Sequence, residues 1–175
     1  GAPRDLTRPP QPVRSVGFGP DGRSLVAAFG MSSDLRVPVV EVWELPDGGH
    51  RKTVEPGQAT VGPFLAIGAR SPTCAVAHTE GVSLYQSPGF EPPVVEVKPG
   101  QGEPTAVDLR ADGRAVAFAV PGAVWLCDAA TGRALAPEVE RDEVLALAFA
   151  PDGQSLFAGG KAGVVWEWPA ADPGP

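Results

Sequence analysis

The sequence of 175 residues predicts an all-β fold made of four repeated antiparallel units. Each unit begins with a hairpin pattern, in which an apolar alternation is followed by a turn dipeptide and a second apolar run. The turns recur at intervals of about 40 residues, and no 11-residue window keeps the i, i+3, i+4 apolar spacing of a helix. The 22 glycines and 21 prolines lie mostly between the apolar runs, which is typical of many short strands joined by many turns.

The four hairpin turns can be placed one by one. Three of them contain Asp-Gly, at residues 21–22, 112–113 and 152–153, and the fourth has Arg70-Ser71 instead. The turns at 21, 70, 112 and 152 are separated by 49, 42 and 40 residues, so the first interval carries an insertion. We assign it to residues 31–38, a polar stretch between apolar runs, where a longer loop costs little folding free energy.

A third apolar run and a shorter fourth run complete the unit. The third runs are residues 39–45, 82–86, 124–128 and 164–168. The fourth runs, found in the first three units, are residues 52–55, 94–97 and 134–137. Four strands recurring at this period are the pattern of a β-propeller blade.

Short motifs on these strands give the units a family resemblance. The third run reads Val40-Glu41-Val42-Trp43-Glu44 in the first unit and Val165-Trp166-Glu167 in the last, and Thr131-Gly132 follows it in the third. The hairpins at 18–22 and 149–153 read Phe-x-Pro-Asp-Gly. In these motifs the chain resembles WD40 repeats of the bacterial type over residues 13–169, with repeats at about 13–50, 51–91, 92–133 and 134–169. The resemblance implies that Trp43 and Trp166 occupy equivalent core positions.

The chain also departs from the family pattern. The family often carries a Gly-His pair before the first strand and an Asp before the third, which joins a buried hydrogen-bond network with a strand Ser or Thr and the Trp. The chain has no Gly-His, and the Asp position holds Glu80, Pro121 and Ala162 in the last three units. We therefore expect apolar packing, more than polar networks, to stabilise the blades.

The number of units predicts a partial, open propeller. Rings of this family usually close with seven or eight blades, whereas four units form an arc with two uncovered end faces. We expect Trp166 and Trp168 to share a pleat face and to lie exposed on the last blade, which makes Trp168 a candidate partner contact. Further blades of a longer parent chain, a second copy closing an eight-bladed ring, or another protein would cover the ends. Residues 1–12 are interpreted as a Pro-rich linker or worn strand and residues 170–175 as a tail.

Composition excludes several classes of partner. The formal net charge is −7 and the 14 Lys and Arg are scattered singly, so no basic stripe for nucleic acid is expected. No run reaches 18 apolar residues and the first 12 residues lack an apolar signal core, so we expect neither a membrane span nor a signal peptide. Cys74 and Cys127 fall inside apolar runs and are predicted to be free core thiols. A cytoplasmic location follows as the expectation.

The sequence predicts no catalytic, cofactor or metal site. Residues 17–22 match G-x-G-x-x-G, but a strand pattern follows where a dinucleotide site needs a helix. His50 and His78 have no second ligand at a metal spacing. His78 and Glu80 are interpreted as exposed loop residues, and no G-x-S-x-G elbow is present.

These observations favour a non-catalytic scaffold that binds protein partners. The expected binding surface is the ring face carrying the loops after the second and fourth strands of each blade, with Arg36, His78 and Lys161 as the candidate contacts. An alternative is the C-terminal part of a larger propeller or signalling protein, such as a bacterial kinase with appended repeats, which rests on family analogy. A propeller hydrolase is the third alternative and would need acids or histidines gathered around a central channel.

Overall fold

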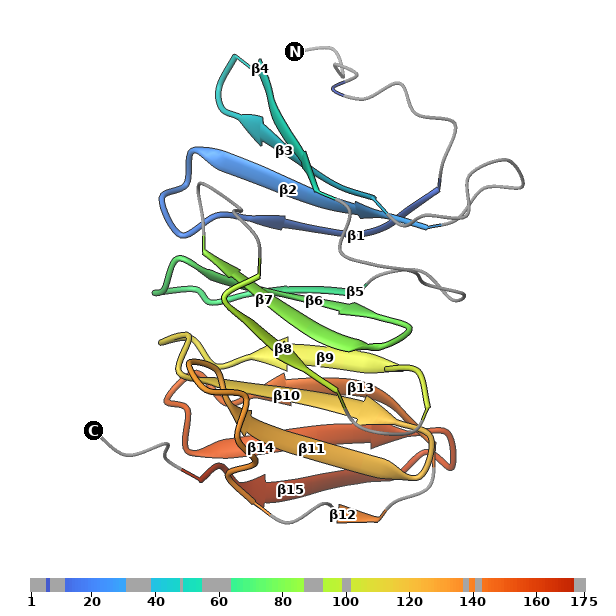
Figure 1. Ribbon diagram of the computed structural model, residues 1–175. Coiled ribbons are helices and arrows are strands. Elements are labelled where there is room, and N and C mark those ends of the chain that lie inside the picture. Colours follow the sequence, from blue (N-terminus) through green and yellow to red (C-terminus); the bar gives the residue numbers. More distant parts are fainter. Residues whose placement is uncertain are drawn as a thin grey trace.

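The computed structural model describes residues 6, 12–30, 39–47, 49–54, 64–86, 93–98, 102–136, 139–140 and 143–171. These residues form strands and turns in four antiparallel sheets, stacked one above the other in an open arc (Figure 1). The predicted all-β partial propeller is therefore confirmed. No membrane-spanning helix occurs among the residues that the structure describes.

Each sheet uses strands that follow one another in the chain. Sheet 1 contains β1 (Val13–Phe18), β2 (Ser24–Phe29), β3 (Val39–Glu44) and β4 (Gly49–Val54). Sheet 2 contains β5 (Phe64–Ile67), β6 (Thr73–His78), β7 (Gly81–Gln86) and β8 (Val95–Val97). Sheet 3 contains β9 (Ala106–Leu109), β10 (Ala115–Val120), β11 (Ala123–Asp128) and β12 (Val139–Glu140). Sheet 4 contains β13 (Val144–Phe149), β14 (Ser155–Gly160) and β15 (Val165–Pro169).

The outer strand of sheet 3 differs from the predicted one. We expected a strand at residues 134–137, but within that run Ala134 makes only an isolated bridge to Cys127. The paired strand is β12, which lies opposite Ala123 and Val124. The chain therefore contacts β11 first at Ala134, and the ladder assigned as β12 lies at the other end of β11.

The antiparallel order gives the arc two distinct faces. The first strands β1, β5, β9 and β13 contact one another in succession along the inner edge. The turns that join first to second strands, at residues 19–23, 68–72, 110–114 and 150–154, lie on one side, which we call the hairpin face (Figure 1). The connections from second to third strands leave from the opposite side, the loop face. Residues 31–38, the predicted insertion, lie outside the described part of the chain.

Each sheet has unlike sides. On β10, Ala115, Ala117 and Ala119 pack toward sheet 4, whereas the alternate residues Val116, Phe118 and Val120 pack toward sheet 2. The same division holds in sheet 2, where Ala75 and Ala77 face sheet 3 while Cys74 and Val76 face sheet 1. Small residues on one sheet therefore receive larger residues from the next, which keeps the sheets close and the interface filled.

Trp125, Trp166 and Trp168 lie on the side of their sheet that faces the preceding sheet. Trp43 lies on the corresponding side of sheet 1. Trp168 pairs with Leu156 as Trp43 pairs with Leu25, so Trp168 and not Trp166 is equivalent to Trp43. The expected equivalence of Trp43 and Trp166 is wrong by two residues. Trp166 pairs with Ala158 in the way that Trp125 pairs with Phe118.

The expectation that Trp166 and Trp168 are exposed at the open end is also wrong. Both pack against the apolar cluster between sheets 3 and 4, with their ring centroids 6.4 Å apart. The strand alternation does place them on one side, but it is the side that faces sheet 3. The open side of sheet 4 carries the neighbouring residues instead, with Val165 71% exposed.

The two cysteines are buried and free, as predicted. Cys74 lies in the core between sheets 1 and 2, and Cys127 in the core between sheets 2 and 3. Burial raises the pKa of both thiols, that of Cys127 to about 11. Both therefore behave as small apolar side chains.

We predict that Gly113→Ala destabilises the protein more than Gly22→Ala. Both glycines have positive φ, 74° and 64°, so alanine costs about 1–2 kcal/mol at either position. A Cβ at residue 22 meets open space, whereas one at residue 113 would overlap Ser71 of sheet 2 and lie 2.9 Å from Thr73 Oγ1. Overpacking adds about 1–3 kcal/mol. Chemical denaturation of both variants measures the difference, and equal losses would contradict tight packing between the hairpins of sheets 2 and 3.

Candidate functional site

Of the four sequence-predicted contact residues, Arg36 lies outside the described residues. His78 is the last residue of β6 and is only 6% exposed. The expectation of an exposed loop residue is therefore wrong, because β6 extends as far as His78 and the connection to β7 begins after it. His78 is not available to a partner.

His78 instead belongs to a buried polar network in sheet 2. Its Nδ1 accepts the Glu80 N–H at 3.3 Å, so Nε2 carries the proton and donates to Ser83 Oγ at 2.8 Å. Ser83 also shares a hydrogen bond with Tyr85. Burial lowers the pKa of His78, which keeps the imidazole neutral. In this sheet a buried polar network accompanies apolar packing, whereas we expected apolar packing to stabilise the blades more than polar networks do.

Lys161 and Trp168 differ in their accessibility. Lys161 is exposed on the loop face, and its Nζ donates to Glu143 Oε2 at 2.8 Å. Trp168 is half-buried against the cluster shared with sheet 3, so its burial is intramolecular and the predicted partner contact is not supported. Lys161 remains a predicted contact of the loop face.

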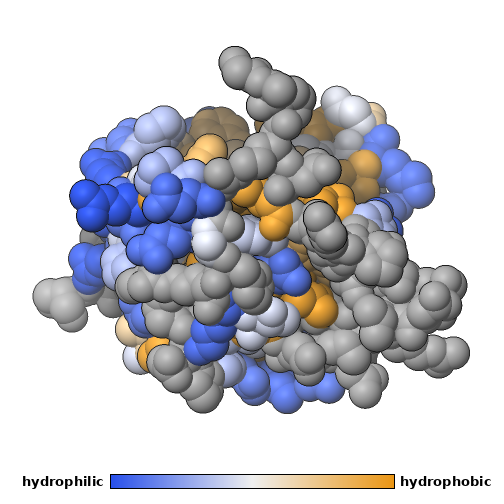
Figure 2. Space-filling view, turned by 90° about the horizontal axis from the view of Figure 1, so that it is seen from above, coloured by the Kyte–Doolittle hydropathy of each residue, from blue (hydrophilic) through white to orange (hydrophobic). Residues whose placement is uncertain are grey.

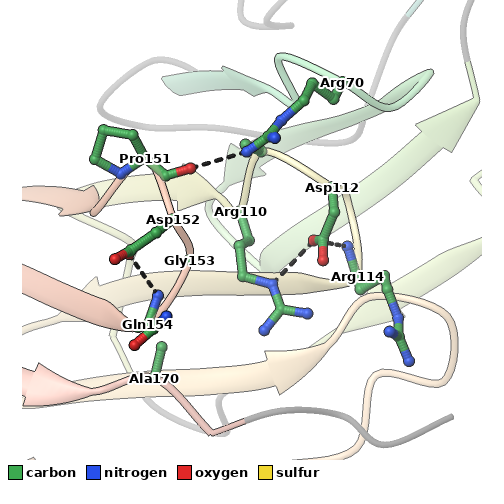
Figure 3. A pocket seen from close by; sticks show the side chains of 10 residues that line it. Arg70, Arg110, Asp112, Arg114, Pro151, Asp152, Gly153, Gln154 and Ala170 are labelled. Carbon is green, nitrogen blue, oxygen red and sulfur yellow. Dashed lines mark hydrogen bonds and ion pairs between the residues drawn. The ribbon is translucent and has the colours of Figure 1, made fainter.

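The structure brings together a different group of residues on the hairpin face. A cavity of about 400 Å³ lies among the turns of sheets 2, 3 and 4 (Figure 3). Its lining is mostly polar and comprises Arg70, Arg110, Ala111, Asp112, Arg114, Pro151, Asp152, Gly153, Gln154 and Ala170. We call this the arginine cavity. A second, more apolar cavity of about 420 Å³ adjoins it and shares Arg70, Ala111 and Pro151.

The hairpin sequences explain how Arg70 reaches this cavity. Asp112 and Asp152 stabilise their own turns by accepting the N–H of the residue two positions later, at 3.0 Å and 2.9 Å. Arg70 stands at the same position in sheet 2, where Ser71 Oγ accepts the Thr73 N–H instead. Arg70 is therefore not needed to stabilise its own turn. Its Nη2 donates to the Pro151 carbonyl of sheet 4 at 2.9 Å.

Arg110 is the most firmly held cation of the cavity. It is 6% exposed, and its Nε donates to Asp112 Oδ1 at 2.9 Å. Its aliphatic stem packs over Gly153, where a Cβ would lie 2.9 Å from Arg110 Cδ. Burial raises the pKa of Asp112, but the hydrogen bonds from Arg110 and the Arg114 N–H outweigh it and the net pKa is lowered. Asp112 is therefore an ionised carboxylate that orients the guanidinium.

The cavity has an excess of one positive charge on an acidic protein. Three arginines and two aspartates line it, in a chain whose net charge is −7. Sequence reasoning missed this group because the arginines are isolated in the chain and 40 residues separate Arg70 from Arg110. Aligning the four hairpins would have found it, since equivalent turns must lie side by side in a propeller.

Asp108 lines the adjoining apolar cavity. It lies on β9, and its Oδ2 accepts the Phe149 N–H of β13 at 2.7 Å, which joins sheets 3 and 4 at their inner edge. Burial raises the pKa of Asp108, and the hydrogen bonds from Phe149 and Leu109 offset this only in part. The described residues contain no group of three His, Cys, Asp or Glu side chains that could hold a metal ion.

Comparison with solved structures supports the fold. The chain is similar to a chain of the "Crystal Structure of Mitotic Checkpoint Complex", with a TM-score of 0.76 and 17% sequence identity. The similarity covers 94% of this chain and 49% of that chain, so this chain spans about half of its length. No family model and no curated protein matches the sequence. The four sheets and this likeness identify a partial β-propeller fold.

We predict that Asp108→Asn stabilises the protein at pH 7. The pKa of Asp108 is raised above its ordinary 3.8, so its contribution to folding is most favourable below pH 3.8 and declines as the pH rises through the folded pKa. Asparagine keeps an acceptor for the Phe149 N–H without the buried charge. The free energy of unfolding should exceed that of the wild type at pH 7, and the difference should shrink toward pH 4.

Denaturant titrations at both pH values measure this difference. Asp152→Asn, which removes a charge from an exposed turn, serves as the control. A gain that does not depend on pH would show that burial of the Asp108 charge is not its cause.

Proposed function

We propose that the chain is a non-catalytic interaction module of the WD40 type that binds an acidic segment of a protein partner in the arginine cavity. One observation carries the proposal: Arg70, Arg110 and Arg114 converge on one cavity from two blades, against the turn of a third. Guanidinium groups recognise carboxylates through paired, charge-assisted hydrogen bonds. A carboxylate-bearing segment is the ligand that this lining suits best.

The arrangement of Arg110 supports this choice. Figure 3 shows its guanidinium between the turn that contains Asp112 and the turn at residues 151–154. The bond from Nε to Asp112 holds this buried guanidinium in the lining of the cavity. Arg70 and Arg114 are exposed, so they are the guanidinium groups that a carboxylate can reach, and Arg110 adds its positive charge to the site.

The adjoining cavity suggests a second feature of the partner. It is lined by Ile67, Leu109 and Phe149 together with shared residues of the arginine cavity. A segment with an acidic residue beside an apolar residue would therefore fill both cavities. The net charge of −7 disfavours acidic ligands over the protein as a whole, so the contacts within the cavity have to supply the attraction.

Membership of the WD40 family, a cytoplasmic location and a place in a signalling protein remain part of this proposal. They rest on the sequence resemblance and on the fold. Absence of catalysis belongs to the proposal as well. The hairpin face replaces the loop face as the preferred surface because His78 is buried and Trp168 packs internally.

We predict that a fluorescein-labelled peptide of eight glutamates with one central leucine binds the protein, and that an equivalent peptide with glutamine in place of glutamate does not. Affinity should fall as salt is raised from 50 to 200 mM, because the contacts are between charges. The double substitution Arg70→Gln and Arg114→Gln should weaken binding about tenfold or more, since a hydrogen bond to a charged group contributes about 1.5–3 kcal/mol. Fluorescence anisotropy measures these affinities.

Lys161→Gln is the matched control, because it removes one cation from the loop face. It should leave binding unchanged. Arg110→Lys keeps the positive charge in the lining, so it should weaken binding less than the double substitution does. If Lys161→Gln weakens binding and the arginine substitutions do not, the loop face is the site and the proposal is wrong.

A further inference from the structure

The three interfaces between consecutive sheets use the same contact at the inner edge. Ile67 of sheet 2 packs on Gly17 of sheet 1, where a Cβ would lie 2.9 Å from Ile67 Cδ1. Phe149 of sheet 4 lies against Asp108 of sheet 3 and donates its N–H to that carboxylate. Leu109 of sheet 3 and Ala66 of sheet 2 belong to one buried cluster.

Strand register shows that these residues are equivalent. The residues that pack, Ile67, Leu109 and Phe149, pair with Cys74, Val116 and Leu156 of the second strands. The residues that receive them, Gly17, Ala66 and Asp108, pair with Val26, Ala75 and Ala117. A residue at the end of the first strand thus packs on the penultimate residue of the preceding first strand.

The two ends of the arc each carry one half of this contact. Phe18 pairs with Leu25 in sheet 1, so it occupies the position of Ile67, but no sheet precedes it in the described part of the chain and it is 64% exposed. Ala148 pairs with Phe157 in sheet 4, so it occupies the position of Gly17, and it is exposed as well. The open ends therefore complement each other.

The surroundings of the two residues extend this match. Beside Ala148, the open side of sheet 4 carries Ala146, Gly159 and the exposed Val165, which are small or aliphatic like the receiving sides inside the arc, together with the larger Phe157, which pairs with Ala148. Beside Phe18, the open side of sheet 1 carries Val16, which is 61% exposed. Exposed apolar side chains grouped in this way indicate a surface that is covered by another molecule.

The open side of sheet 1 is already covered in part. Leu6 packs against the cluster of Ala27, Phe29 and Trp43, whereas Val16 and Phe18 of β1 stay exposed. Figure 2 looks onto this end and shows apolar side chains gathered over its described part. The bare strip is the inner edge, which is the part of a blade that meets its neighbour most closely.

We propose that two copies of the chain associate head to tail, with Phe18 of each copy seated on Ala148 of the other. The occupant is a second copy because this chain itself supplies both halves of the contact. Two such contacts, related by a twofold axis along the ring, close eight blades and leave no open end. Closure buries the exposed residues of β1, Ala148 and Val165 in two equivalent seams.

Light scattering after size exclusion, run on the 175-residue chain across a concentration series, tests the proposal. The expected mass is twice the 18.0 kDa of the chain. Raised salt should favour the dimer, because each copy carries a net charge of −7. A monomer at every concentration and salt level would overturn the proposal. Species that grow steadily with concentration would overturn ring closure.

Substitutions at the two ends make the test specific. Phe18→Glu and Ala148→Arg should each give a monomer, because each places a charge in both seams. An equimolar mixture of the two should restore the dimer, since one seam then holds Glu opposite Arg and the other is unaltered. Val94→Glu is the matched control: Val94 is 61% exposed, outside either end, and its substitution should leave the dimer intact. A dimer that persists in Phe18→Glu, or a mixture that stays monomeric, would contradict head-to-tail pairing.

Discussion

The unlike sides of each sheet are the constraint on which the rest of the structure depends. A side of small residues, such as Ala115, Ala117 and Ala119 on β10, can approach a neighbouring sheet only if that sheet presents larger side chains. The larger side chains lie on the side that faces the preceding sheet at the interfaces of sheets 2 with 3 and 3 with 4. Stacking at these interfaces is therefore directional. An arc built in this way has two different ends.

The hairpin face shows how a departure from the repeat creates a site. In three units an Asp stabilises its own turn. Asp21, for example, accepts the Arg23 and Ser24 N–H groups. Sheet 2 has Arg70 there and leaves the turn to Ser71. The exchange costs little local stability, because another side chain supplies the acceptor. It also places the Arg70 guanidinium against sheet 4, where it donates to the Pro151 carbonyl. A regular Asp-Gly turn has no cation at this position. The least regular repeat is thus the one that joins the hairpins across the arc.

Period-two alternation and turn dipeptides were sufficient to predict the fold, because both are local properties of the chain. They also predicted that Trp166 and Trp168 share one side of β15. Which side faces the core depends on the pairing of Trp168 with Leu156 and of Trp166 with Ala158. The sequence of β15 alone does not determine that register. The arginine cavity and the buried position of His78 were missed for related reasons. The cavity joins turns far apart in sequence, and His78 depends on where β6 ends, which sequence patterns fix poorly.

The twofold ring would have a consequence for the hairpin face. A rotation about the ring axis does not exchange the two faces of a propeller, so both hairpin faces would lie on the same side. The two arginine cavities would then be presented together, one from each copy. Two sites on one surface bind a partner with two acidic segments more tightly than either site alone, provided that the linker spans them. Directional packing between sheets would in this way determine the number of binding sites on one face as well as the shape of the arc.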